Sequence, residues 1–285
     1  MKTIWNRVHE KAPLVHAITN YVTINDCANI VLASGASPIM AEAPEEVAEI
    51  SSRSQGLLLN LGMLRSDKLE AMILAGQAAN KRGIPVVLDP VGVGASAFRM
   101  NSVRRLLHEI SCSVIRGNAS EILSLCQVGS SQGVDAAKAD ALTQDTLVQN
   151  ASYARDLARR THSIIAMTGE IDLVTDGHIV YQNHHGCSML SRLTGSGCML
   201  SALVTAAVAA NPEDPLLATL TAVTAMGLCG EIAARRMREQ DGNGSFRTYL
   251  LDAVFCLTGE KLEEQAHITG GDGHIIDCMR RIDFE

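Results

Sequence analysis

Residues 85–116 read PVVLDPVGVGASAFRMNSVRRLLHEISCSVIR, and this stretch decides the fold. It opens with an apolar run at 85–89, continues with an amphipathic segment at 101–110, and closes with a second apolar run at 113–116. Short continuous apolar runs are typical of strands buried on both faces of a parallel sheet, and such strands need a helical crossover between them. The stretch therefore predicts a strand–helix–strand unit.

The same alternation extends outward along most of the chain. Further apolar runs occupy residues 14–18, 57–61 and 163–167, and amphipathic segments occupy residues 66–82 and 146–161. Repeated strand and helix segments predict a layered α/β fold, with right-handed crossovers and a mostly parallel sheet.

The sequence after residue 167 departs from this alternation. Residues 172–175 and 178–181 flank Asp176-Gly177, which predicts a β-hairpin with a two-residue turn and antiparallel strands at the sheet edge. Three helices are expected next, over residues 198–210, 215–239 and 245–265. We expect segment 129–145 to be a long surface loop and the tail, 267–285, to be poorly ordered. No linker divides the chain, so residues 1–285 are expected to form a single domain.

Composition narrows the possible functions. The chain has 285 residues and a net charge of −7, with 3% aromatic residues. Without a basic stripe or aromatic platforms, such an acidic chain is not expected to bind nucleic acid. Residues 1–11 lack the apolar core of a signal peptide, and the uncharged stretch between Arg192 and Glu213 gives a helix too short to cross a bilayer. We therefore expect a cytoplasmic protein with no membrane partner and with reduced cysteines.

The sequence Thr194-Gly195-Ser196-Gly197-Cys198 directly precedes an apolar helix. Glycines let the backbone approach a ligand closely, and the first turn of a helix presents unpaired N–H groups with a partial positive charge. Such a turn suits an anion, for example a transferring phosphoryl group. A plain tight turn into a buried helix is the alternative, and no Walker-type lysine follows.

Polar residues also follow three of the predicted strands. Asp89 ends one strand, Arg116 ends the next, and Thr168 follows a third. The carboxyl ends of parallel strands are where open α/β sheets bind ligands. Arg116 is a candidate phosphate ligand. Asp89 and Glu121 provide the carboxylates that Mg²⁺ takes beside substrate phosphates.

Other interpretations apply to some of these residues. Asn118 and Glu121 have the spacing of a helix capping box, which would give them a purely structural role. Gly92-x-Gly94 is a weak dinucleotide-binding signal, but the next predicted strand does not end in the acidic residue that such a site needs. The convergence of several polar strand ends with a glycine turn on one edge favours phosphoryl transfer.

Together these segments resemble the hydroxyethylthiazole kinase family of the ribokinase-like kinases. The segments that carry the resemblance follow the family's order over residues 4–263, at 13–22, 35–40, 88–92, 115–122, 167–170 and 194–198. The resemblance implies a ribokinase-like three-layer sandwich. It also implies Mg²⁺- and ATP-dependent phosphorylation of the primary hydroxyl of 4-methyl-5-(2-hydroxyethyl)thiazole in thiamin salvage. A homotrimer with the thiazole site at a subunit interface is expected on the same ground.

The resemblance also implies roles for particular residues. The residues expected around the thiazole are Asn20, Val22, Met40, Gly62 and Gly195, and those expected to bind ATP are Arg116, Asn118 and Thr168. Asp89 and Glu121 are expected to hold magnesium. Gly195, Gly197 and Cys198 are expected to take part in catalysis. Most ribokinase-like kinases have Asp at the position of Cys198. A cysteine at this position departs from the superfamily but is similar to the hydroxyethylthiazole kinase family. We expect Cys198 to shape the pocket and hydrogen-bond the alcohol, because like charge disfavours a thiolate beside a triphosphate.

Several departures and alternatives accompany this assignment. Met63 and Asn243 stand where the family usually has Thr and Pro, and His16 is interpreted as a structural histidine on a buried strand. A sister kinase of the superfamily would instead phosphorylate a hydroxymethylpyrimidine or another small alcohol. A non-catalytic nucleotide or small-molecule binder is an alternative of another class. The interpretation as a nicotinamide-dependent oxidoreductase is supported only by the Gly92-x-Gly94 motif.

Overall fold

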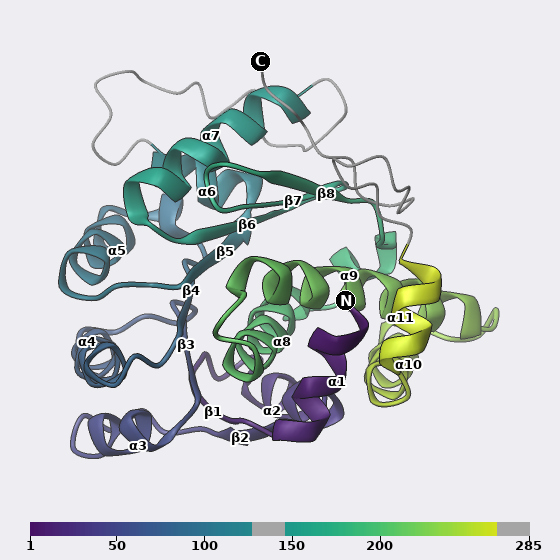
Figure 1. The fold of residues 1–285 in the computed structure, drawn as a ribbon, viewed down its shortest axis with the longest axis horizontal. Coiled ribbons are helices and arrows are strands. Elements are labelled where there is room, and N and C mark those ends of the chain that lie inside the picture. Colours follow the sequence, from purple (N-terminus) through teal and green to yellow (C-terminus); the bar gives the residue numbers. More distant parts are fainter. Residues whose placement is uncertain (127–145, 267–285) are drawn as a thin grey trace.

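The computed structural model describes residues 1–126 and 146–266 (Figure 1). Its strands form one eight-stranded sheet in the order β2-β1-β3-β4-β5-β6-β7-β8. The strands are β1 (Leu14–Ile18), β2 (Ser37–Ile39), β3 (Gly56–Asn60), β4 (Val86–Asp89), β5 (Val114–Asn118), β6 (Ile164–Thr168), β7 (Asp172–Thr175) and β8 (Val180–Asn183). The predicted loop at 129–145 and the predicted disordered tail at 267–285 lie outside the described residues.

The sheet is parallel from β2 to β6 and antiparallel beyond β6. The antiparallel hairpin is confirmed, but its predicted two-residue turn is wrong. Thr175 pairs with Val180, so four residues connect the strands. The Asp176 side chain accepts hydrogen bonds from the backbone N–H groups of His178 and Ile179, both at 2.8 Å. This local bonding favours the longer loop and starts the second strand two residues later than predicted.

Two helical layers cover the sheet, which Figure 1 shows close to edge-on. One layer contains α3 (Val47–Arg53), α4 (Ser66–Lys81), α5 (Ala97–Glu109), α6 (Ala119–Cys126) and α7 (Leu147–Thr161). The other contains α1 (Lys2–Lys11), α2 (Ile24–Ala33), α8 (Ser196–Ala210), α9 (Pro215–Arg236), α10 (Asn243–Phe255) and α11 (Gly259–Gln265). The predicted fold class, a three-layer α/β sandwich with helices on both faces of a mostly parallel sheet, is confirmed.

Burial on both faces explains why the central strands are apolar throughout. On β3, Leu58 belongs to the core beneath α8, whereas Leu57 and Leu59 belong to the core on the α4 side. All three side chains are fully buried. Alternate residues of a strand point to opposite faces, so a sheet between two helical layers needs apolar residues at both sets of positions.

The helices differ from the prediction mainly at the two ends of the chain. The structure adds α1, α2 and α3 and the short strand β2, for which no expectation was made. The helix expected over 245–265 is two helices. Helix α10 ends at Phe255, and α11 begins after Thr258, whose hydroxyl accepts a hydrogen bond from the Lys261 N–H. An N-cap residue of this kind begins a new helix with its own axis.

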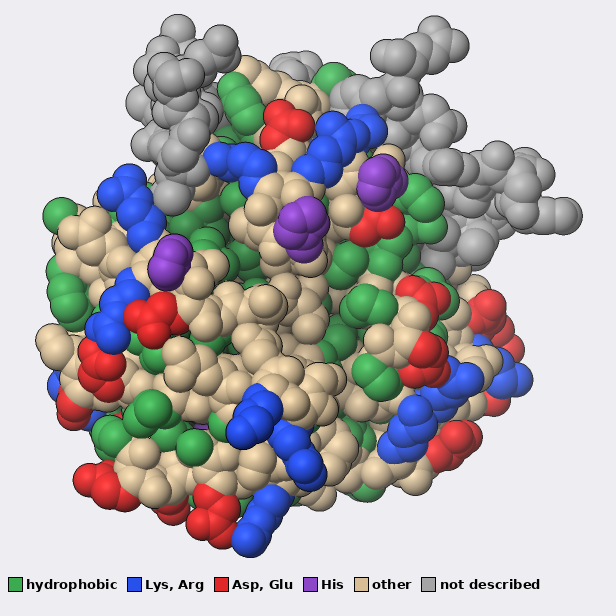
Figure 2. All heavy atoms as spheres, turned by 60° about the vertical axis from the view of Figure 1, so that its left-hand side comes forward, with side chains coloured by type: hydrophobic (Ala, Val, Ile, Leu, Met, Phe, Trp, Pro, Cys, Tyr) green, Lys and Arg blue, Asp and Glu red, His purple; other side chains and the backbone are tan. Residues whose placement is uncertain are grey.

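Helix α9 is long and apolar enough to cross a membrane by length and composition. However, 78% of its most apolar window is buried inside the protein, where it packs against α8, α10 and the sheet. A helix that is apolar on all sides and surrounded by protein is a core helix. On the face shown in Figure 2, Lys and Arg side chains lie among Asp and Glu side chains.

Candidate active site

The polar strand ends predicted from the sequence meet at one edge of the sheet, beside the N-terminus of α8. They line a cavity of about 810 Å³. The cavity contains eight of the predicted residues, which are Asp89, Arg116, Asn118, Glu121, Thr168, Gly195, Gly197 and Cys198. A pocket of this volume is in the range that binds a cofactor-sized ligand.

Asp89 lies at the end of β4 and is completely buried. One carboxylate oxygen, Oδ2, accepts hydrogen bonds from Asn60 Nδ2 at 2.8 Å and Ser201 Oγ at 2.7 Å. The other, Oδ1, is buried and has no protein partner among the described residues. Burial raises the pKa of Asp89 to about 6, helped by the negative charge of Glu121 and opposed by the positive charge of Arg116. The carboxylate therefore keeps one oxygen without a protein partner at a buried position of the cavity wall.

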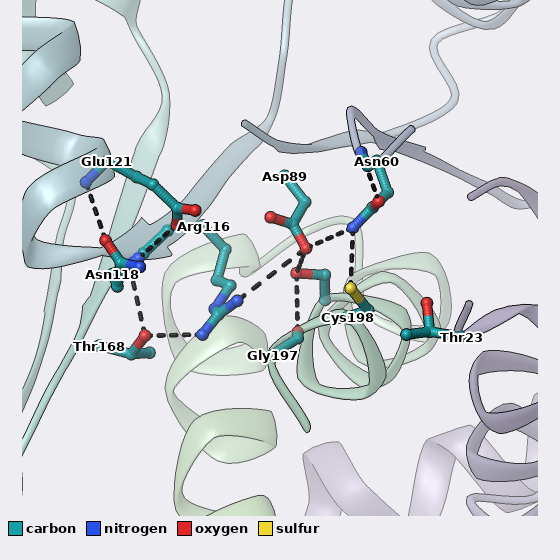
Figure 3. A network of polar contacts seen from close by, with 12 residues as sticks. Thr23, Asn60, Asp89, Arg116, Asn118, Glu121, Thr168, Gly197 and Cys198 are labelled. Atoms are coloured by element: carbon teal, nitrogen blue, oxygen red, sulfur yellow. Dashed lines mark hydrogen bonds and ion pairs between the residues drawn. The ribbon is translucent and has the colours of Figure 1, made fainter. Parts of the chain in front are cut away.

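Arg116 lies between two of the predicted site residues. Its guanidinium is 3.9 Å from Asp89 Oδ2 and donates a 2.7 Å hydrogen bond to the Thr168 hydroxyl (Figure 3). A Cβ atom on Gly197 would lie 2.6 Å from Arg116 Nη1. Glycine at 197 thus lets the guanidinium lie directly against the first turn of α8, which places a side-chain cation beside the helix N–H groups.

Gly195 shapes the start of α8. Its φ of 86° is in the left-handed region, and a Cβ atom there would lie 3.0 Å from Thr23 Cβ. Only glycine adopts this conformation readily, and a side chain would also collide with Thr23. The turn directs the unpaired N–H groups of the α8 first turn toward the cavity edge, which favours bound anions.

Asn118 and Glu121 form the capping box that was considered as their structural alternative. The Glu121 N–H donates to Asn118 Oδ1 at 2.8 Å, and the Asn118 N–H donates to Glu121 Oε2 at 2.9 Å. Glu121 Oε1 accepts a further bond from the Gly92 N–H at 2.9 Å. The box begins α6 and also holds the Glu121 carboxylate in place at the cavity wall.

Cys198 is held by two asparagine side chains. Its Sγ accepts hydrogen bonds from Asn20 Nδ2 at 3.4 Å and Asn60 Nδ2 at 3.3 Å. Burial raises the pKa of the Cys198 thiol, and the negative charge of Asp89 raises it further. The hydrogen bonds from Asn20 and Asn60 lower the pKa in the opposite direction, but burial outweighs them and favours the neutral thiol.

Sequence analysis missed Asn60 and Ser201. Asn60 is the one polar residue of the predicted strand 57–61, and the sheet register places it directly beside Asp89. Ser201 lies one helical turn after Gly197 and also donates to the Gly197 carbonyl at 3.2 Å. An amide at the end of an apolar strand was the signal that could have identified Asn60.

Four of the residues expected around the thiazole do not line this cavity, namely Asn20, Val22, Met40 and Gly62. Asn20 nevertheless reaches Cys198, and Gly62 lies against Asn20, since a Cβ atom on Gly62 would be 2.6 Å from Asn20 Nδ2. Val22 is 63% exposed, and Met40 is partly buried against the core.

His16 has a structural environment. Its two ring nitrogens bond to Ser51 Oγ at 2.8 Å and to the Ala41 carbonyl at 2.9 Å. These bonds connect β1 to α3 and to the chain before it. Of the two glycines of the weak dinucleotide signal, Gly94 is exposed but lies close to α6, because a Cβ atom on it would be 2.7 Å from Ser124 Oγ.

The oxygen ligands of the site suit magnesium. In the described part of the chain, no group of three or more His, Cys, Asp or Glu residues is arranged to hold a metal ion. Mg²⁺ commonly takes one or two carboxylates together with substrate phosphates and water. Asp89 Oδ1 is a buried oxygen without a protein partner, and the Glu121 carboxylate is close enough to raise the pKa of Asp89. The two carboxylates therefore fit a cation that arrives with a phosphate ligand.

Comparison with known proteins places the chain in a class and then in a family. A ribokinase-like superfamily protein from Enterococcus faecalis has the same fold, with a TM-score of 0.60 and 11% identity over 88% of this chain and 93% of that one. This likeness defines the class of fold, a mostly parallel sheet between two helical layers, with the cavity at the carboxyl ends of its strands.

The family follows from closer matches. The sequence profile of the hydroxyethylthiazole kinase family matches residues 5–260. A protein from Clostridium acetobutylicum named hydroxyethylthiazole kinase is 49% identical over 256 residues, 89% of this chain and 93% of its own length. The solved structure of hydroxyethylthiazole kinase protein from Pyrococcus horikoshii has a TM-score of 0.83 and 32% identity, covering 99% and 98% of the two chains. The chain belongs to the hydroxyethylthiazole kinase family, as the sequence resemblance predicted, and it is a kinase.

Proposed function

We propose that the protein transfers the γ-phosphoryl group of Mg·ATP to the primary hydroxyl of 4-methyl-5-(2-hydroxyethyl)thiazole, forming its monophosphate for thiamin salvage. The observation that carries the proposal is the meeting of Asp89, Arg116 and the α8 N-terminus around Cys198, in a chain whose curated relatives are named for this activity.

Phosphoryl transfer needs little covalent help from the protein, because alignment and charge neutralisation supply most of the catalysis. Arg116, Thr168 and Asn118 bind the nucleotide, and Arg116 offsets negative charge on the phosphates. The first-turn N–H groups of α8, shaped by Gly195 and Gly197, receive the transferring group. Orienting two bound reactants in this way can supply about 7–11 kcal/mol of the barrier.

Asp89 and Glu121 would hold Mg²⁺, which supplies positive charge that offsets the charge of the phosphate oxygens. Asn60 and Ser201 keep Asp89 in a fixed orientation by bonding to Oδ2, so that Oδ1 stays directed away from them.

Cys198 shapes the end of the cavity at which the alcohol binds. Asn20 and Asn60 both donate to its sulfur, which leaves the neutral S–H group to hydrogen-bond the substrate hydroxyl. With no thiolate at this position, the hydroxyl proton leaves late in the reaction or passes to the phosphate. Asn20, Val22, Met40, Gly62 and Gly195 surround the thiazole in this proposal.

We also propose a homotrimer, located in the cytoplasm, with the thiazole site at the subunit interface. Tyr21, Val22 and Met63 are 50%, 63% and 48% exposed, and they adjoin Asn20 and Gly62 in the sequence. Large exposed apolar side chains next to a binding segment are typical of a surface that another chain covers.

The proposed reaction is tested by ADP release from Mg·ATP with and without hydroxyethylthiazole, together with mass spectrometry of the product. We expect thiazole-dependent ADP release and a product heavier by one phosphate group. ADP release with a hydroxymethylpyrimidine alone would transfer the proposal to the sister kinase. If no alcohol tested stimulates ADP release, the result would favour a non-catalytic binding protein.

A further inference from the structure

His185 lies in the same cavity but has no role in the function proposed so far. It follows β8 by two residues and lines the cavity wall together with its neighbours Gly186 and Cys187. One ring nitrogen, Nδ1, is 2.9 Å from Glu231 Oε1 on α9. The other, Nε2, is buried and has no partner among the described residues. A buried polar atom without a partner at a cavity wall is a candidate ligand contact.

The surrounding contacts hold this histidine in one orientation. Its carbonyl accepts a 3.2 Å hydrogen bond from Asn183 Nδ2, and a Cβ atom on Gly227 would lie 2.7 Å from its carbonyl carbon. Glycine at 227 therefore allows the backbone of His185 to lie directly on α9. Glu231, one turn further along α9, accepts bonds from both the imidazole and the Gly186 N–H, the latter at 3.1 Å.

Glu231 also determines which hydrogen bond the free nitrogen can make. An ionised carboxylate only accepts hydrogen bonds, so the proton of the neutral imidazole is on Nδ1. Nε2 is then a hydrogen-bond acceptor. Arg235 Nη1 lies 3.6 Å from the other Glu231 oxygen, Oε2, and forms an ion pair with it.

The sheet order shows which end of a nucleotide His185 would meet. The site residues follow the sequence of strands along one edge, with Asp89 on β4, Arg116 on β5, Thr168 on β6 and His185 after β8. Strands are about 4.8 Å apart, so β8 is roughly 19 Å from β4 and roughly 10 Å from β6. The anion-binding start of α8 lies beside Asp89 and Arg116, at the opposite end of the cavity from β8.

The cavity wall near His185 combines polar side chains, such as Asp172 and Ser188, with apolar side chains. Val223 and Met226 of α9 line it, and both are almost completely buried. Figure 1 shows β8 leading into the segment beside α9. Apolar side chains beside a firmly held acceptor suit the nucleoside part of ATP, whose base is flat and uncharged and which carries amino and hydroxyl donors.

We propose that His185 is a nucleotide-binding residue that determines specificity, and that its Nε2 accepts a hydrogen bond from a donor group of the ATP nucleoside. The donor is either the amino group of the base or a ribose hydroxyl, which share this chemistry. Glu231 is the positioning residue that keeps the ring in the accepting form. The inference rests on the proposed function in that ATP is the nucleotide.

The test combines a His185→Leu variant with nucleotide analogues. Leucine keeps the size of the side chain and removes the acceptor. We expect the KM for ATP and the Kd for ADP, measured by calorimetry, to rise about five- to tenfold, which is the value of one hydrogen bond. The KM for the thiazole should stay unchanged, and the melting temperature of the nucleotide-free protein should fall slightly, because Glu231 loses the imidazole donor but keeps the Gly186 N–H. His178→Leu, at an exposed position in the connection between β7 and β8, is the matched control.

Three analogues identify the donor in the wild-type protein, so that the test does not depend on the variant alone. They are purine riboside triphosphate, which lacks the amino group, 2′-deoxy-ATP and 3′-deoxy-ATP. To the wild type, one of these analogues should bind about fivefold more weakly than ATP. To the His185→Leu variant, the same analogue and ATP should bind equally well. Equal loss in both proteins for all three, or unchanged ADP affinity in His185→Leu, would overturn the proposal.

This design separates the inference from the proposed function. A wild-type protein that binds ADP but does not phosphorylate the thiazole contradicts the proposed substrate, while the ADP affinities still decide the role of His185. A protein that phosphorylates the thiazole with identical kinetics in the wild type and His185→Leu contradicts only the inference.

Discussion

Asp89 and Cys198 are buried polar residues whose contacts leave part of their hydrogen-bonding capacity available to the cavity. Asn60 connects them, since its Nδ2 group donates to Asp89 Oδ2 at 2.8 Å and to Cys198 Sγ at 3.3 Å. Buried networks of this kind orient side chains more tightly than isolated contacts do. Substitutions in this network should therefore show whether a residue acts by orienting its neighbours or by its own charge.

Cys198→Ser tests whether a thiolate takes part in catalysis. Serine keeps a hydroxyl that can accept from Asn20 and Asn60 and donate to the alcohol, but it does not ionise near neutral pH. Because burial raises the pKa of the thiol, we expect the kcat of the variant to stay within about tenfold of the wild type. Steady-state assays from pH 6.5 to 9 measure this. Complete loss of activity would show that the sulfur is chemically required.

Asp89→Asn tests how much the buried carboxylate lowers the free energy of unfolding. The measurement uses metal-free protein with a chelator. Burial raises the pKa of Asp89 from 3.8 to about 6, so the native state binds the proton more tightly than the unfolded state. The wild type therefore loses stability as the pH rises from about 4 to 6, by about 3 kcal/mol at most. The variant should have a larger free energy of unfolding above pH 6, and this advantage should shrink toward pH 4. Urea titrations at several pH values measure it, and a pH-independent difference would contradict the assignment.

Helix α8 positions several residues of the candidate site. Its first turn holds Gly197 against Arg116, its second turn carries Ser201 to Asp89, and the rest of the helix is buried in the core. A helix buried along its length cannot tilt without opening the core, so the anion-binding end is held rigidly in position. Small residues at its start are therefore a requirement of the site and not of the helix.

Gly197→Ala should impair nucleotide use with little effect on stability. The added Cβ atom would lie 2.6 Å from Arg116 Nη1, so the guanidinium must move away from the α8 start. We expect kcat/KM for ATP to fall at least tenfold, with a melting temperature within a few degrees of the wild type, because alanine favours the helix. Gly244→Ala is the matched control, since Gly244 is also the second residue of a helix and has open space around it. Equal kinetics in the two variants would contradict the role of Gly197.

At the scale of the whole molecule, the site has two unequal halves. The proposed nucleotide half is a cavity lined within one chain, whereas most residues proposed around the thiazole lie by an exposed segment that includes Tyr21 and Val22. Under the proposed function, a single chain would enclose ATP better than it would enclose the alcohol. A second subunit would complete the alcohol site.

Val22→Glu should disrupt the proposed trimer. Val22 is 63% exposed in the single chain, so a glutamate there does not disturb folding, but a charge buried at an interface is costly. We expect the mass from light scattering to change from three chains to one, with a strongly raised KM for the thiazole and a nearly unchanged Kd for ADP. Leu74→Glu, on the exposed side of α4, is the control. A trimer that survives Val22→Glu would place the interface elsewhere.

Most of the fold was predictable from local patterns. The central strands are apolar because helices cover both faces, and this produces continuous runs such as residues 57–61 that predict strands directly. The two-residue turn at Asp176-Gly177 was wrong because the Asp176 side chain bonds to two backbone N–H groups and closes a longer loop. The short strand β2 was missed because three partly exposed residues carry too weak a pattern.

The candidate site was predictable only in part. The sequence was sufficient to place Asp89, Arg116 and Thr168 at or near the ends of strands, and parallel strands bring their carboxyl ends to one edge of the sheet. Only the tertiary structure decided that Asn60 bridges Asp89 and Cys198, and that His185 and Glu231 meet on α9 at the far end of the cavity. Local propensity acts between near neighbours in the chain, whereas these contacts join residues 29 to 138 positions apart. Packing and sheet order alone bring them together.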